Sequence, residues 1–294
     1  MVRRDGTRFR AFALAVAMQM LALPVLAHWG WVQLSIPAFY PLGAVLGGYV
    51  FGLAMGWAGG CAAGLWYKWG SGDWGCFAAL VGMIGGAVAT EAGPLRWVRE
   101  QVQQVGSAEE IRTATLGKLL GAEWIVYPLG GLILLWLARS RANTPAGAWS
   151  WPRTGIALGL LGILAWPLSG LAGRFFGMAV LPGSTALLDF AVTGQRSSLN
   201  WDLLLVLGLP LGAYLAARQQ GPVCSEPVPG PELVRALGGG LLLGVGASLA
   251  GGCTVGHSLV GVPLLSVGSI VTTVFILLGS WTTGYFELRK KGSR

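Results

Sequence analysis

The chain has 294 residues, of which 54% are apolar and only 11% are charged, and it contains 48 glycines. A soluble domain carries roughly 25% charged residues, and a disordered chain combines low hydrophobicity with high charge, so this composition argues against a soluble enzyme and excludes a disordered chain. The glycines follow no three-residue period, which excludes collagen. The remaining class is an integral membrane protein. The high glycine content supports it, because glycine is more frequent in membrane helices than in soluble ones.

The net charge of +8 has its most telling clusters at the two ends of the chain. Basic residues flank the first and the last apolar segment: Arg3, Arg4, Arg8 and Arg10, and Arg289, Lys290, Lys291 and Arg294. Basic residues beside membrane segments mark the cytoplasmic side, so we expect both termini in the cytoplasm. The sequence shows no basic face with interleaved aromatic residues outside the apolar segments, so nucleic-acid binding is not expected.

The first apolar run covers residues 11–67, which contain no Asp, Glu, Lys or Arg. As continuous helix it would be about 85 Å long, enough for two crossings of a hydrocarbon core about 30 Å thick and a shorter piece. We expect helix breaks near Pro24, His28–Gly30 and Pro37–Pro41. The start of this run has the features of a signal peptide, but further apolar segments follow at once, so we expect it to be retained.

The later apolar runs cover residues 74–90, 119–138, 154–173, 199–217, 233–252 and 266–286. Residues 91–118 are rich in charge and are expected to form a polar linker or a surface helix. Pro210 is expected to interrupt the run in which it lies. We therefore predict an all-α integral membrane protein with about eight or nine transmembrane helices, each of which needs about 20 residues.

An internal repeat is the most informative feature of the sequence. The string GGYVFGLAMGWAGGCAAG (Gly47–Gly64) corresponds position by position to GGLLLGVGASLAGGCTVG (Gly239–Gly256). Both copies contain A-G-G-C-x-x-G, with Cys61 in the first and Cys253 in the second. We expect one transport domain over residues 1–294, with the first repeat at about 40–93, the second at about 232–286 and the linker at about 91–118.

Glycine pairs inside apolar segments favour unwound backbone, which survives in a membrane only where protein or a water-filled cavity covers it. Two such segments in corresponding halves point to the binding site of a transporter. The N-terminus of a half-helix suits an anion, and a thiol adds a weak donor and a polarisable sulfur. A soft, sulfur-bearing anion fits this pairing. The alternative is close packing of helices around glycine, with each cysteine acting as a small apolar residue.

The candidate substrate-binding residues lie in the two strings and just after them: Gly59, Gly60, Cys61, Lys68, Gly251, Gly252, Cys253, Thr254 and His257. Lys68 could compensate the charge of a substrate or could be an interfacial lysine. His257, four residues after Cys253, could contact substrate or hold the loop, and Thr254 could cap a half-helix.

The remaining cysteines, Cys76 and Cys224, have no counterpart in the other repeat, and we expect no role for them. The sequence contains no C-x-x-C pair and only two histidines, so neither a metal ion nor another cofactor is predicted. Glu123 lies inside an apolar run but near its start, so it is left out of the candidate site.

The motifs AGGCAAG (Ala58–Gly64) and AGGCTVGHSLVG (Ala250–Gly261) resemble the paired signature of the YeeE/YedE sulfur-transport family. The resemblance implies two pseudo-symmetric halves, which we expect to be inverted, with central re-entrant half-helices. It implies uptake of thiosulfate or a related sulfur anion across the bacterial inner membrane, with Cys61 and Cys253 lining the path. A small cytoplasmic sulfur-carrier protein would be a partner. Family members can carry another cysteine early in the chain, and this chain has none before Cys61.

A permease, rather than an enzyme, is therefore the predicted function. The anion would meet one thiol and then the other, because weak successive sites allow both entry and exit. Three alternatives stay open: a membrane thiol oxidoreductase or sulfurtransferase that uses the same cysteines, a selenium-related transporter, and a pore for a neutral solute. The first lacks the C-x-x-C that commonly lowers a thiol pKa in redox enzymes.

Overall fold

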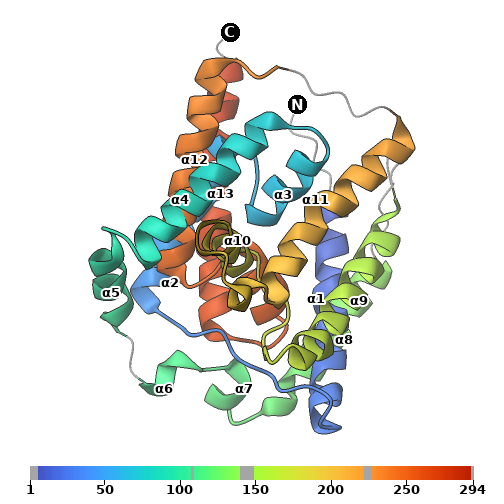
Figure 1. Ribbon diagram of the computed structural model, residues 1–294. Helices are drawn as coiled ribbons and strands as arrows, with labels where there is room; N and C mark the ends of the chain where they lie inside the picture. Colours follow the sequence, from blue (N-terminus) through green and yellow to red (C-terminus); the bar gives the residue numbers. More distant parts are fainter. Residues whose placement is uncertain (1–5, 107–108, 140–148, 222–226, 293–294) are drawn as a thin grey trace. The chain divides into compact units, whose positions relative to one another are not determined.

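The computed structural model describes residues 6–106, 109–139, 149–221 and 227–292, and most of these residues are helical (Figure 1). No strand occurs in these ranges, and Thr115 and Ser266 form an isolated antiparallel bridge. The prediction of an all-α protein is confirmed. The long helices are α1 (Thr7–His28), α2 (Pro41–Ala58), α4 (Trp74–Glu91), α9 (Trp151–Leu171), α11 (Trp201–Gln220), α12 (Gly230–Ala250) and α13 (Val267–Gly292).

Shorter helices connect the long ones. They are α3 (Ala62–Gly70), α5 (Arg96–Gln104), α6 (Glu109–Arg112), α7 (Leu116–Leu119), α8 (Val126–Arg139) and α10 (Leu181–Thr193), together with the 3₁₀ turns η1 (Glu123–Ile125) and η2 (Arg196–Ser198) and the π-helix η3 (Val255–Gly261). The expected polar linker thus contains α5, α6 and α7, and no residue of α5 is buried.

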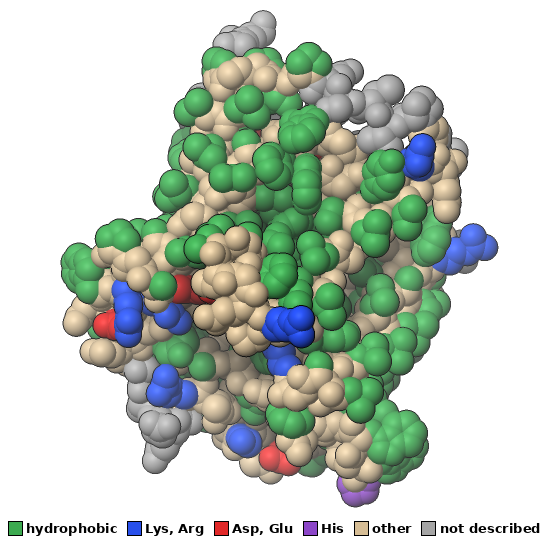
Figure 2. Space-filling view, in the orientation of Figure 1, with side chains coloured by type: hydrophobic (Ala, Val, Ile, Leu, Met, Phe, Trp, Pro, Cys, Tyr) green, Lys and Arg blue, Asp and Glu red, His purple; other side chains and the backbone are tan. Residues whose placement is uncertain are grey.

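Seven helical segments in the described ranges are long and apolar enough to cross a membrane, with α2 and α3 counted as one segment. We expected eight or nine, and the difference falls on α8 and α10, which have 14 and 13 residues and are shorter than the roughly 20 residues that a crossing needs. Apolar side chains are spread over the face shown in Figure 2, as expected where helices meet lipid. The chain is a multi-pass membrane protein.

Three prolines lie inside the described long helices without ending them: Pro24, Pro167 and Pro210. We expected breaks at Pro24 and Pro210, but α1 and α11 continue through these residues. Membrane helices tolerate proline, because local adjustments and neighbouring groups satisfy the carbonyls that it leaves unpaired. The other two expected breaks, at His28–Gly30 and Pro37–Pro41, are correct, since α1 ends at the first and α2 begins at the second.

The chain divides into two compact units, each described by itself. Unit 1 comprises Met1–Ile36, Thr113–Met178 and Ser258–Val267, and unit 2 comprises Pro37–Arg112, Ala179–His257 and Gly268–Arg294. Both motif cysteines belong to unit 2. The expected single transport domain and its repeat boundaries stay predictions.

Unit 1 contains α1 packed against α8 and α9. Glycines on α9 let α1 approach closely: a Cβ on Gly159 would lie 2.8 Å from the sulfur of Met18, and one on Gly162 would lie 2.5 Å from the Gln19 amide. Small residues at such positions are typical of helix pairs in membranes. A buried cluster that includes Leu23 and Trp166 completes this interface.

Unit 2 has α12 at its centre, packed against both α2 and α4. A Cβ on Gly47 would lie 2.5 Å from the amide nitrogen of Ala250, and one on Gly239 would lie 2.5 Å from the amide nitrogen of Ala58. Gly47 corresponds to Gly239 in the repeat, and Ala58 corresponds to Ala250, so each copy makes the same contact with the other copy. Because the residue numbers rise along α2 while they fall along α12, the two helices are antiparallel.

The same exchange extends to the helix that follows each motif. A Cβ on Gly52 of α2 would lie 2.2 Å from the Ile276 carbonyl oxygen of α13, and one on Gly244 of α12 would lie 2.1 Å from the Met83 carbonyl oxygen of α4. Each copy therefore packs its glycine face onto the other copy's second helix. Larger residues at these positions would force the backbones apart, so the glycines fix the close approach of α2, α4, α12 and α13.

Candidate functional site

The first motif is a break between α2 and α3. α2 ends at Ala58, and Gly59 follows with φ +89°, a left-handed conformation in which its amide N–H donates to the Met55 carbonyl. A Cβ disfavours this conformation, so glycine is the residue that ends helices in this way. Cys61 then adopts an extended conformation at the N-terminus of α3, and its carbonyl accepts from the Leu65 amide at 2.9 Å.

The second motif repeats this geometry after α12. Gly251 has φ +79° and donates its amide N–H to the Ala247 carbonyl. The Cys253 carbonyl accepts from the His257 amide at 3.0 Å, in the same relation as Cys61 and Leu65. Both predicted breaks are therefore present, and each places a cysteine at the start of a new helical segment.

The two motif cysteines lie in the same part of unit 2. Cys253 is only 2% exposed and belongs to the large buried cluster of this unit, and the half-buried Cys61 packs against that cluster. A Cβ on Gly64 would lie 3.5 Å from the sulfur of Cys61, so this sulfur lies against the first turn of α3. Both thiols are free. This arrangement brings two thiols and a helix N-terminus together, which can bind a soft anion.

The side chain of Lys68 contacts the first motif. Its ammonium group donates a hydrogen bond to the Gly59 carbonyl, and a Cβ on Gly60 would lie 3.8 Å from Nζ. The carbonyls at the end of a helix carry the negative end of its dipole, which would repel an anion. Lys68 therefore offsets that charge beside Cys61, whereas a purely interfacial lysine would extend away from the motif.

The second motif contains two buried polar atoms that lack a hydrogen-bond partner within the described part of the chain, Thr254 Oγ1 and His257 Nε2. His257 is 1% exposed, its Nδ1 lies 3.2 Å from Ser269 Oγ, and its Nε2 would be 3.0 Å from a Cβ on Gly252. Buried polar groups normally have partners, and an unpaired one costs about 1–3 kcal/mol. The site is therefore suited to a polar ligand.

Three residues near the motifs were not among the candidates. Tyr40 places its ring against Gly251, and Gln103 and Arg112 of the linker reach the same region. The only sequence signal for these contacts was the polar composition of the linker.

Cys76, for which we expected no role, lies beside the first motif: its sulfur would be 3.8 Å from a Cβ on Gly59. Its thiol donates to Asp73 Oδ2 at 3.3 Å, and Cys224 lies outside the described residues.

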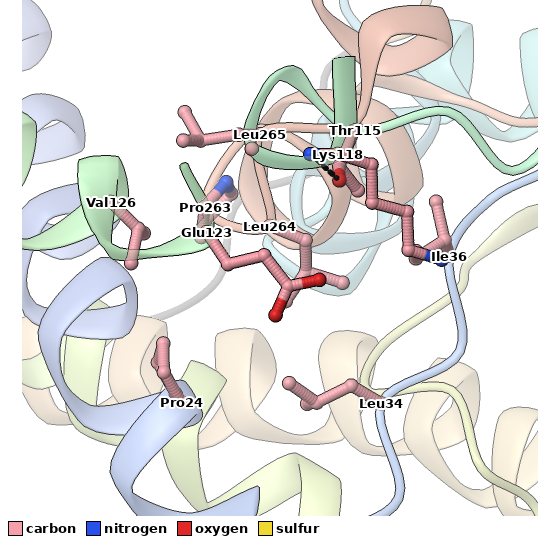
Figure 3. Close-up of a pocket in the computed structure, with 11 residues that line it drawn as sticks. Pro24, Leu34, Ile36, Thr115, Lys118, Glu123, Val126, Pro263, Leu264 and Leu265 are labelled. Atoms are coloured by element: carbon pink, nitrogen blue, oxygen red, sulfur yellow. Dashed lines mark hydrogen bonds between the residues drawn. The ribbon is translucent and has the colours of Figure 1, made fainter. Parts of the chain in front are cut away.

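Unit 1 has a separate cavity of about 200 Å³ that none of the motif residues lines. Its walls are mainly apolar, and the carboxylate of Glu123 points into it while Lys118 lies at one side (Figure 3). The described residues hold no cluster of His, Cys, Asp and Glu that could bind a metal ion. The candidate site residues therefore lie away from the walls of this cavity.

Apolar helices that carry two glycine–cysteine breaks define a multi-pass membrane protein of the transporter class. The family model described as sulphur transport matches residues 1–282. The chain belongs to the sulphur transport family. It is a transporter rather than an enzyme, and the predicted family membership is confirmed.

Relatives with established names match nearly the whole chain. A protein of Spirochaeta thermophila named thiosulfate transporter TsuA is 32% identical over 302 aligned residues, which cover 98% of this chain and 90% of the relative. The Escherichia coli protein of the same name is 30% identical, with 96% of this chain and 85% of the relative covered. A shorter protein of Xylella fastidiosa, named probable transporter, is 31% identical over 43% of this chain and 87% of its own length.

Proposed function

We propose that this protein takes up thiosulfate, or a related sulfur-containing anion, across the bacterial inner membrane along a path lined by Cys61 and Cys253. The observation that carries the proposal is the paired break: in each copy a left-handed glycine ends a helix, and a cysteine stands at the start of the next helical segment. Two relatives that match nearly the full chain are named thiosulfate transporters.

The anion would first be held by one motif and then by the other. At the first motif, the amides at the start of α3 and the charge of Lys68 favour the anion, and the Cys61 thiol contacts its sulfur. At the second motif, Cys253 offers the same contact, and Thr254 and His257 each offer a polar atom that has no partner among the residues the structure describes. The backbone of Gly59, Gly60, Gly251 and Gly252 lets the chain approach the anion closely. Each contact is weak, which allows release as well as binding.

We also propose that the two repeats are inverted with respect to each other. The reciprocal glycine contacts and the antiparallel α2 and α12 support this arrangement, which is the one that alternating-access transporters commonly use. The basic residues near both termini support a cytoplasmic location for each end. A small cytoplasmic sulfur-carrier protein that accepts the anion is part of the same proposal.

The test is uptake of labelled thiosulfate by cells that lack their own uptake system, with each variant matched for its amount in the membrane. We expect uptake by the intact chain and its loss in Cys61→Ala and in Cys253→Ala. Cys76→Ala is the control, because it removes a neighbouring thiol that points to Asp73. Uptake that persists in both motif variants would overturn the thiol-lined path.

The outcome without thiosulfate uptake is also informative. An intact, well-inserted protein that takes up no thiosulfate would direct the search to selenium or other sulfur species. A disulfide between Cys61 and Cys253, or a persulfide on either residue, found by mass spectrometry during turnover would favour the thiol oxidoreductase or sulfurtransferase instead.

A further inference from the structure

The polar linker reaches the second motif through Gln103 of α5. The side-chain amide of Gln103 donates to the carbonyls of Ser248 and Leu249, at 3.1 and 3.3 Å. These carbonyls belong to the last turn of α12, where no further helical amide is available to them. The Ser248 hydroxyl donates in turn to Glu91 Oε1 at 3.0 Å. The carboxylate of Glu91, at the end of α4, therefore has a hydrogen-bond donor. The linker is therefore part of the wall of the second motif.

A tyrosine ring lies directly against the glycine break of this motif. Tyr40 is the residue that precedes α2, and its Cδ2 and Cε2 would each lie 3.3 Å from a Cβ on Gly251. Because α2 and α12 are antiparallel, the beginning of α2 meets the end of α12, which places this ring next to the second motif. Tyr40 itself is half-buried.

Arg112, the last residue of α6 in the linker, lies above the Tyr40 ring. Its guanidinium carbon lies 5.5 Å from the ring centroid, and its Nη2 donates to the Tyr40 hydroxyl at 3.4 Å. The Arg112 carbonyl also accepts from the Phe39 amide at 2.8 Å, and Phe39 packs against Gly268 at the start of α13. The position of the guanidinium is therefore fixed by backbone and ring contacts on both sides.

We propose that Tyr40 and Arg112 form a cationic mouth of the second motif, which selects anions and passes them to Cys253. The inference rests on the proposed function and adds the residues that set its charge selectivity. The buried Thr254 Oγ1 and His257 Nε2, which lack a hydrogen-bond partner among the described residues, are the independent sign that the second motif binds a polar ligand. Arg112 supplies the charge that attracts the anion, and Tyr40 holds the guanidinium beside Gly251.

The first measurement is the kinetics of thiosulfate uptake for Arg112→Gln, Arg112→Lys and the intact chain. We expect Arg112→Gln to raise KM about five- to tenfold with little change in Vmax, which is the effect of one pair of unit charges about 4 Å apart in water. Arg112→Lys keeps the charge and should recover most of the affinity. Rising ionic strength should raise KM less in Arg112→Gln than in the intact chain, because the screened charge is absent.

Arg96→Gln is the matched control, since Arg96 lies in the same linker but pairs with Glu100 on an exposed face of α5. A KM in Arg112→Gln that equals the KM in Arg96→Gln would overturn the proposal. A fall in Vmax that Arg112→Lys shares with Arg112→Gln would also overturn it, because it would show that Arg112 only holds the fold.

A second measurement does not depend on the substrate. The purified proteins are treated with iodoacetate, an anion, or with neutral iodoacetamide, and mass spectrometry gives the rate at each cysteine. We expect Arg112→Gln to lower the ratio of the two rates at Cys253 by several-fold and to leave it unchanged at Cys61. An unchanged ratio at Cys253 would overturn the mouth. A lowered ratio in a protein that takes up no thiosulfate would keep the mouth and reject only the proposed substrate.

Discussion

The two glycine–cysteine motifs share one backbone geometry but are held by different surroundings. In the first, the side chain that binds the end of the preceding helix is Lys68, which comes from the half-helix that starts in the motif itself. In the second, Gln103 performs this task from the linker, and Tyr40 covers the glycine. The comparison teaches that a repeated string can fix the shape of two sites, while residues outside it give each site its own charge and partners.

This difference predicts which substitutions affect both motifs and which affect only one. The first motif has a cation of its own, Lys68, which donates a hydrogen bond to the Gly59 carbonyl at the helix break. The second keeps two buried polar atoms without partners in the described residues and depends on a distant segment of the chain. Substitutions that act on the shared geometry should therefore affect both motifs alike, and substitutions that act on the surroundings should affect one.

The largest effect is expected at the glycines through which the repeats pack on each other. In Gly52→Ala and Gly244→Ala the added methyl would meet a carbonyl oxygen at 2.2 and 2.1 Å, so each variant should lose about 1–3 kcal/mol of stability or more. Gly85→Ala is the control, because a Cβ there meets nothing within 4 Å. Thermal unfolding in detergent measures the loss, and a clear difference between the first two variants would break the equivalence of the repeats.

A smaller and unequal effect is expected at the second glycine of each motif. A Cβ on Gly252 would lie 3.0 Å from His257 Nε2, whereas the nearest atoms to a Cβ on Gly60 are 3.8 Å away. Gly252→Ala should therefore displace His257 and lower uptake by about tenfold, the effect of roughly 1.4 kcal/mol. Gly60→Ala should lower it less. Uptake assays at equal membrane amounts check this, and equal losses would show that the two sites do not differ in this respect.

The sequence alone predicted most of the long helices and the breaks that carry the motifs. Apolar runs of adequate length predict α4, α9, α12 and α13 to within a few residues, and the Gly-Gly-Cys strings predict where two helices end. Proline was a poorer guide, since Pro24 and Pro210 were expected to break helices that in fact continue. A proline's effect depends on which neighbours can satisfy the freed carbonyl, and local sequence does not contain that information.

The surroundings of the second motif could not be predicted for a related reason. Gln103 and Ser248 are 145 positions apart, and Arg112 reaches Tyr40 across 72 positions. Gln103 and Arg112 lie in the linker, outside both repeats, so the repeat carries no signal for their contacts. Such contacts arise only when the helices pack, whereas a glycine in a left-handed turn is required by the backbone at that position itself.

Substitutions of Lys68 and Gln103, the two side chains that bind the helix ends, should have different effects: one on substrate binding and the other on stability. Lys68→Met removes a charge beside Cys61 and should raise the KM of uptake by a few-fold. Gln103→Leu leaves two carbonyls of α12 without their donor and should cost about 1–3 kcal/mol of stability. Uptake kinetics and thermal unfolding of both variants decide this. The distinction would be wrong if Gln103→Leu raised KM while its unfolding temperature stayed the same.

The smallest effect is expected for Thr254→Val, which removes one hydroxyl and keeps the shape of the side chain. Thr254 Oγ1 is buried without a partner in the described residues, and replacing such a group by an apolar one of equal shape is close to neutral or slightly stabilising. The unfolding temperature should therefore stay the same or rise. If the hydroxyl binds the anion, KM should still rise by about two- to tenfold, the value of one hydrogen bond. A variant that loses stability would show instead that the hydroxyl has a structural partner. A variant unchanged in both measurements would remove Thr254 from the site, and the second motif would then depend on Cys253 and His257.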